Sequence, residues 1–182
     1  MGKTYEAIDD EMREWIAAQH LFFVATAPLA GDGHVNLSPK GLDTFAVLGP
    51  REVAHLDLTG SGVETVAHVR ENGRITLLFS AFEGRPRIVR LYGRGAVVEI
   101  DDPEYAALAA RFGTFPSARA VIRVAVSRIA DSCGYGVPRF EYAGERPQLP
   151  AWASRKGPDA LRAYRAEKNA VSIDGLPALK AR

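Results

Sequence analysis

Cysteine, methionine and surplus charge are all scarce in this chain of 182 residues. The single cysteine, Cys133, excludes an internal disulfide and a metal site built from several cysteines. The 23 basic and 22 acidic side chains leave a formal net charge of +1, which gives no electrostatic footprint for nucleic acid or an anionic membrane. We therefore expect neither of these partners, and a small-molecule substrate instead.

Long apolar runs are absent as well. No run approaches the roughly 18 apolar residues of a membrane-spanning helix, and residues 1–6 lack the apolar core of a signal peptide. The sequence therefore predicts a cytoplasmic protein. A hydrophobic share of 47% in a chain of this length suffices for one self-contained core.

What the chain has in plenty is strand-like segments rich in Val, Ile and Leu. They are joined mostly by short turns with only occasional helical patterns, which favours a mainly β, antiparallel barrel with peripheral helices over a parallel sheet. The six expected strands are residues 21–26, 34–38, 52–58, 74–82, 87–100 and 120–129. The expected helices lie near residues 5–16, 63–72, 103–112 and 158–168. We expect one domain, with the barrel in 1–130 and a loop, helix and tail in 131–182 that pack on the barrel or on a partner subunit.

The most informative segment is residues 57–65, where a strand ends at small residues and a helical pattern begins at once. The N–H groups at a helix start have no intrahelical partner and lie at the positive end of the helix dipole, so they suit a phosphate. The alternative is a plain turn in which Ser61 caps the helix in a capping box with Glu64. A nicotinamide dinucleotide loop fits less well, because Thr65 stands where the third glycine of that motif belongs.

A second polar cluster precedes this segment by about twenty residues. Asn36, Ser38 and Lys40 share one parity and point the same way if the strand persists past Pro39. An amide, a hydroxyl and an ammonium on one face form a hydrogen-bonding wall for a heteroaromatic ring or a phosphate. The alternative is that Lys40 is only a solvated lysine at a strand end.

Other candidate side chains carry weaker signals. Arg87 and Arg90 face opposite sides of one expected strand, so one belongs to the surface and the other can neutralise a phosphate with Arg94 or Lys40. The four histidines have no metal-ligand spacing, and we expect no zinc site. Cys133 is expected to be a buried, inert thiol.

The clusters at 36–41 and 57–65, with the strand 87–93, resemble the pyridoxamine 5′-phosphate oxidase-like, FMN-binding split-barrel family over about residues 22–129. The resemblance implies a six-stranded antiparallel split β-barrel of Greek-key type and a homodimer with FMN in each cleft between subunits. Lys40 then stands where the family has a flavin-contacting lysine. The residues expected to contact the cofactor are Asn36, Ser38, Lys40, Asp57, Thr59, Gly60, Ser61, Gly62, Thr65, Arg87 and Arg90.

The chain also departs from the true oxidases of that family. They have an Arg-Lys pair where this chain has Glu64 and Thr65, so we expect a related FMN-dependent oxidoreductase rather than a pyridoxamine phosphate oxidase. It would pass hydride or electrons between a reduced nicotinamide or small organic substrate and an acceptor. The alternatives are an F420-dependent reductase of the same fold and a non-catalytic flavin- or haem-binding protein, with His55 or His68 as the axial candidate.

Overall fold

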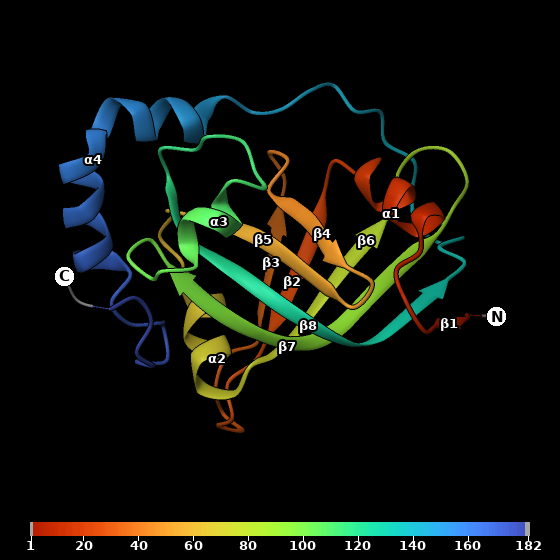
Figure 1. The fold of residues 1–182 in the computed structure, drawn as a ribbon, viewed down its shortest axis with the longest axis horizontal. Helices are drawn as coiled ribbons and strands as arrows, with labels where there is room; N and C mark the ends of the chain where they lie inside the picture. The colour runs from red at the N-terminus through yellow and green to blue at the C-terminus, as the bar shows by residue number, and fades with distance from the viewer. Residues whose placement is uncertain (1, 181–182) are drawn as a thin grey trace.

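A computed structural model describes residues 2–180 of the chain. Its strands form one antiparallel sheet, and four helices lie around it (Figure 1). The strands are β1 (Thr4–Tyr5), β2 (Phe22–Thr26), β3 (Asn36–Lys40), β4 (Phe45–Gly49), β5 (Glu52–Leu58), β6 (Arg74–Ser80), β7 (Ile88–Glu99) and β8 (Ala118–Ser132). The helices are α1 (Asp10–Ala17), α2 (Glu64–Asn72), α3 (Tyr105–Ala109) and α4 (Gln148–Lys168).

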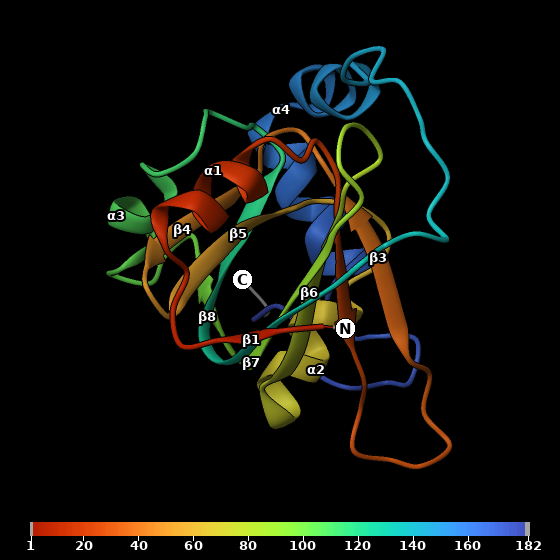
Figure 2. The ribbon, with the colours of Figure 1, turned by 90° about the vertical axis from the view of Figure 1, so that its right-hand side faces the viewer.

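The sheet curls around an apolar interior (Figure 2). The strand order is β3-β2-β6-β7-β8-β5-β4, with β1 paired to β8, so β3 and β4 are its two edges. β7 and β8 are long, with 12 and 15 residues, and they pair along most of their length. Leu77, Leu91 and Ile122 are fully buried between the two halves of the sheet. The expected antiparallel split barrel is confirmed. The expected number of six strands was wrong, because the sheet in residues 2–180 has eight: β1, which stands where the first helix was expected to begin, and β4 are the additional ones.

A bulge between Tyr92 and Gly93 interrupts the β7–β8 pairing, and glycine is required there. A Cβ on Gly93 would lie 2.3 Å from the carbonyl oxygen of Ala125. Gly93→Ala is expected to lower the free energy of unfolding by about 1–3 kcal/mol, because the two strands must separate. Gly31→Ala is the control, since its Cβ would meet nothing within 4 Å. Equal midpoints for the two variants in urea denaturation would contradict this account.

Several elements differ from the sequence-based expectation. β4 was not expected: its short apolar run has no polar alternation, and it becomes a strand by pairing with β5. The expected last helix is only the second half of α4, which kinks at Gly157, where φ is 73°. α3 ends at Ala109, short of the expected residue 112. The expectation that Cys133 is buried was wrong, because it follows β8 in an exposed surface loop.

The C-terminal part of the chain packs on its own barrel. The Asn169 side chain donates to the carbonyl of Gly60 at 2.9 Å, and the Lys180 ammonium reaches Asp102 at 2.9 Å. Figure 1 shows α4 running along one end of the sheet. These contacts bring the tail next to the loop between β5 and α2.

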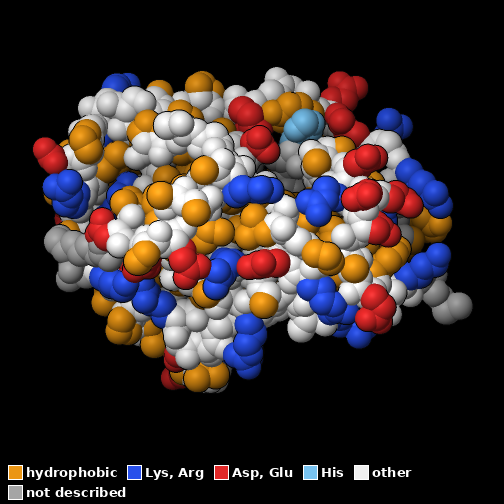
Figure 3. Space-filling model, viewed as in Figure 1, with side chains coloured by type: hydrophobic (Ala, Val, Ile, Leu, Met, Phe, Trp, Pro, Cys, Tyr) orange, Lys and Arg blue, Asp and Glu red, His pale blue; other side chains and the backbone are white. Residues whose placement is uncertain are grey.

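None of the helices in residues 2–180 combines the length and apolarity needed to cross a bilayer. Within the same residues, no three His, Cys, Asp or Glu side chains gather as metal ligands. On the face drawn in Figure 3, acidic and basic side chains are interspersed rather than separated into patches.

Candidate functional site

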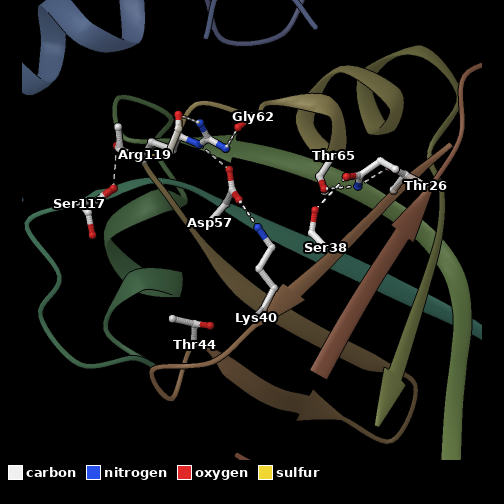
Figure 4. Close-up of polar contacts among 12 residues, drawn as sticks. Thr26, Ser38, Lys40, Thr44, Asp57, Gly62, Thr65, Ser117 and Arg119 are labelled. Carbon is white, nitrogen blue, oxygen red and sulfur yellow. Dashed lines mark hydrogen bonds and ion pairs between the residues drawn. The ribbon is translucent and has the colours of Figure 1, made fainter. Parts of the chain in front are cut away.

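The loop between β5 and α2 is held from inside by Arg119, at the start of β8 (Figure 4). The guanidinium donates to the carbonyl of Gly62 at 2.7 Å and to that of Gly60 at 3.4 Å. Its Nε also contacts Oδ2 of Asp57 at 2.6 Å. Because these two carbonyls turn inward, the N–H groups of Gly60, Ser61 and Gly62 make no hydrogen bond within the described residues. The loop therefore presents unused backbone donors.

Asp57 links Arg119 to Lys40. The Lys40 ammonium lies 3.4 Å from Oδ1 of Asp57, and the Asp57 side chain is fully buried whereas that of Lys40 is 23% exposed. Burial alone would raise the pKa of Asp57, but the charges of Arg119 and then Lys40 outweigh it and hold this pKa well below its usual range. Two cations thus share one carboxylate, and the group carries a net positive charge next to the loop.

The side chains expected to form a polar wall on β3 do lie together. The Asn36 amide donates to Thr65 at 3.0 Å and to Thr26 at 3.1 Å, and its oxygen accepts from the Ser38 hydroxyl at 2.8 Å. Figure 4 shows Ser38 and Thr65 close together, with Lys40 beyond them at the end of the strand. This network ties β3 and β2 to the first turn of α2, so it sets the position of the helix start.

Thr59 anchors the other side of the loop. It is fully buried, and its hydroxyl donates to the carbonyl of Ser117 at 2.7 Å. Nε of Arg165, on α4, donates to the same hydroxyl at 2.8 Å. Thr59 and Asp57 were both expected to contact a cofactor. Both side chains are fully buried and hydrogen-bonded within the chain, so they fix the position of the loop.

The expected capping box is wrong. The N-cap of α2 is Val63, with no side-chain hydrogen bond, so Ser61 lies two residues too early and Glu64 is the first helical residue. The Glu64 carboxylate instead folds back over the loop: a Cβ on Gly62 would lie 2.7 Å from its Oε2. With no cap in place, the N–H groups of the first turn stay unpaired in the described residues.

Arg87 and Arg90 lie away from this cluster. Arg87 contacts Asp131 at 3.4 Å and the Tyr5 hydroxyl at 3.2 Å, and Arg90 donates to Ser132 at 3.0 Å. Arg87 directly precedes β7 and Arg90 lies near its start, whereas the loop lies near the other end of that strand. Within this chain the two arginines do not join the expected phosphate site, because the strand register places them at the end of β7 that is remote from the loop.

The two histidines considered as axial haem ligands are both buried. His55 faces the barrel interior against Phe22, and neither ring nitrogen has a hydrogen-bond partner. Burial, followed by the charge of Lys40, lowers the pKa of His55 to about 4. His68 has no exposed surface and is hydrogen-bonded to Thr26 at 3.0 Å. Neither ring lies open to a bound ligand.

Sequence reasoning missed the three side chains that hold the loop: Arg119, Arg165 and Asn169. For Arg119 a signal exists, since it stands between two alanines at the start of an apolar strand. A charge there is buried only if it is paired. Arg165 lies on α4 and Asn169 directly follows it, 106 and 109 positions beyond their partners Thr59 and Gly60, and only the tertiary fold brings them to the loop.

Comparison with known proteins places this geometry in a family. The family described as pyridoxamine 5′-phosphate oxidase matches residues 8–133. The chain belongs to that family. It is 42% identical to ustO of Aspergillus flavus, a pyridoxamine 5′-phosphate oxidase family protein, over 96% of this chain and 77% of that one.

Solved structures of other proteins share the fold. HupZ from Group A Streptococcus superimposes with a TM-score of 0.53 at 25% identity, over 67% of this chain and 91% of that one. The FAD binding protein of Mycobacterium smegmatis gives 0.51 at 18% identity, over 71% of this chain and 98% of that one, and shows the fold alone. The part of the chain that carries the loop and the polar wall falls within the matched residues.

Proposed function

We propose that this protein is a flavoprotein that binds FMN at the loop between β5 and α2 and acts as an oxidoreductase. The observation that carries the proposal is a set of N–H groups, at 60–62 and at the start of α2, that have no partner among residues 2–180. They lie beside the net positive charge of Lys40, Asp57 and Arg119. Such donors at a helix start bind phosphate. Membership of the family supports a flavin, and one solved protein of this fold is named for FAD binding.

The residues present fit a flavin phosphate without the Arg-Lys pair of the true oxidases. The backbone donors at 60–62 and at the start of α2 meet its charge, while Glu64 opposes it from its position over Gly62. A glycine at 60, with nothing within 4 Å of its Cβ position, leaves room for close approach. FMN, when bound, supplies the hydride or electron transfer.

The residues of the chain have positioning and electrostatic tasks. Lys40 is the one partly exposed cation of its cluster, so its ammonium stabilises negative charge on a reduced ring system. Asn36 and Ser38 fix the wall on which the ring would lie. The substrate would be a reduced nicotinamide or a small organic molecule.

A homodimer belongs to the same proposal. The edge strand β3 is preceded by Val35, which is 73% exposed, and it carries Leu37, which is 66% exposed. Ile173 of the tail is a further exposed aliphatic side chain, at 70%. An exposed apolar edge strand invites pairing with another chain, and a second copy of this chain would cover it.

The test is a titration of the purified, flavin-free protein with FMN, followed by quenching of flavin fluorescence. FMN is expected to bind one per subunit and at least about tenfold more tightly than riboflavin, because riboflavin lacks the phosphate. Lys40→Met is expected to weaken FMN binding about tenfold through loss of a charged donor. Lys3→Met, an exposed lysine at the other end of the barrel, is the matched control.

Three results would reject the proposal. They are a colourless protein that ignores added FMN, equal affinity for riboflavin and FMN, or equal losses for the two lysine variants. Competition with F420 and FAD separates FMN from the two related cofactors, because tighter binding of either would replace FMN in the proposal.

A further inference from the structure

A cavity of about 450 Å³ lies between the second half of α4, α3 and the C-terminal tail. Figure 1 shows α4 and the C-terminal tail at the same end of the sheet. The volume falls in the range of small-molecule sites, roughly 300–1,000 Å³. Its wall combines apolar and cationic side chains, among them Tyr105, Phe115, Leu161, Leu179, Arg162 and Arg165.

Arg165 is the unusual member of this wall. Its Nε and Nη2 donate to Thr59 and to the carbonyl of Ala118, both at 2.8 Å and both neutral. No carboxylate within residues 2–180 pairs with it, and its Nη1 makes no hydrogen bond there. Burial, and then the charge of Arg119, lower the pKa of Arg165. A half-buried guanidinium with only neutral partners is costly and favours an incoming anion.

Arg162 provides a second positive charge, about one helical turn before Arg165 on α4. Its partner is Asp159 at 3.3 Å, and the two side chains are 68% and 91% exposed. An ion pair so exposed is weak and easily exchanged. Positions 162 and 165 lie three apart on one helix, so their side chains are neighbours on the same face.

The other charges on the cavity wall are largely matched. Lys180 contacts Asp102 at 2.9 Å, and Glu99 pairs with Arg70 and accepts from the Lys180 N–H. Arg119 is committed to Asp57. In total, four cations and two carboxylates line the cavity, Asp101 being the second carboxylate. The surplus cations are the two arginines of α4.

We propose that this cavity binds an organic anion that has an apolar or aromatic body. The carboxylate, sulfonate or phosphate group would lie against Arg162 and Arg165, which offer several N–H donors to its oxygens. The body would lie against Tyr105, Phe115 and Leu161. This site is distinct from the proposed flavin site and does not depend on a bound flavin.

Two exposed alanines on α4 allow a clean test. Ala166 lines the cavity, whereas Ala163, on the same helix, does not. The fluorescent aromatic anion anilinonaphthalene sulfonate serves as the probe, and its binding is measured by fluorescence titration. Ala166→Trp fills the cavity and is expected to weaken binding at least about tenfold, or about 1.4 kcal/mol. Ala163→Trp is expected to leave it unchanged.

The charge is tested separately. Arg162→Gln is expected to weaken probe binding about tenfold, and Arg155→Gln, an exposed arginine of α4 outside the cavity, is the matched control. The neutral analogue phenylnaphthylamine is expected to bind at least about tenfold more weakly than the sulfonate.

The proposal is overturned if saturable binding of the sulfonate is absent, if both tryptophan variants behave alike, or if the neutral analogue binds equally well. FMN affinity, measured on the same variants, is expected to stay unchanged. If the unaltered protein does not bind FMN, only the proposed function is rejected, because the titration with the sulfonate needs no flavin.

Discussion

Replacing Arg119 by methionine is expected to lower the free energy of unfolding by about 3–5 kcal/mol, the largest loss among the substitutions considered. The change leaves the fully buried Asp57 with Lys40 alone, at 3.4 Å. It also leaves the carbonyl of Gly62 without its donor, whereas the carbonyl of Gly60 keeps the Asn169 amide at 2.9 Å. Since domains have only about 5–15 kcal/mol of stability, the variant will be marginally folded at best. Urea denaturation followed by circular dichroism measures the loss.

Arg123→Met is the matched control on the same strand. Arg123 makes ion pairs with Glu52 and Glu104, but all three side chains are 39–60% exposed. Such exposed pairs contribute about 0–1 kcal/mol, so this variant should stay close to the unaltered protein. If both variants lose the same stability, Arg119 does not hold the loop in the way its contacts indicate.

FMN binding by the Arg119→Met variant connects this stability effect with the proposed function. The inward turn of the loop carbonyls is what leaves the N–H groups unpaired, and Arg119 maintains that turn. At temperatures where the variant is still folded, its FMN affinity is expected to fall by at least about tenfold, as for loss of a charged hydrogen bond. Unchanged affinity would mean that the loop keeps its shape without the guanidinium.

Local pattern was sufficient to predict most of the barrel. The strand at 52–58 agrees with β5 to the residue, and α2 ends at Asn72 as expected, with Gly73 after it in the left-handed conformation. Both signals are local in sequence. The strand is indicated by its apolar residues, and the end of the helix by the conformational freedom of the glycine backbone. β4 was not predicted, because it becomes a strand by pairing with β5 and its own sequence pattern does not indicate one.

The candidate site was predictable only in part, and the reason is the range of the interactions. Asn36, Ser38 and Lys40 share a strand face, and this periodicity was enough to group them. The inward-facing partners were not predictable, because Arg165 reaches Thr59 across 106 positions of sequence. The prediction that Ser61 caps α2 was wrong for a related reason. The start of this helix depends on the contacts of Asn36 in β3 with Thr65 and of Arg119 in β8 with Gly62.

His55 is expected to make the protein sensitive to mild acid. Its pKa in the folded state is about 4, below the ordinary value of 6.5, because burial and then the charge of Lys40 disfavour the cation. The unfolded chain therefore takes up a proton between pH 6.5 and pH 4 that the folded chain does not. Stability falls as the pH is lowered through this window, by roughly 3 kcal/mol in total. Asp57 offsets part of the effect by favouring the charged ring, and Arg119 adds to it.

His55→Leu removes the titrating group and the two unpartnered nitrogens, so its stability should change far less between pH 7.5 and pH 4.5 than that of the unaltered protein. The control is His34→Gln. His34 is exposed, and its hydrogen bond to Asp174 raises its pKa, so it gives stability at low pH that is lost as the pH rises. The two histidines therefore act in opposite directions, and denaturation of both variants at the two pH values distinguishes them. If His55→Leu keeps the full loss of stability in acid, the proton uptake occurs elsewhere in the chain, and the burial of an uncharged His55 does not explain it.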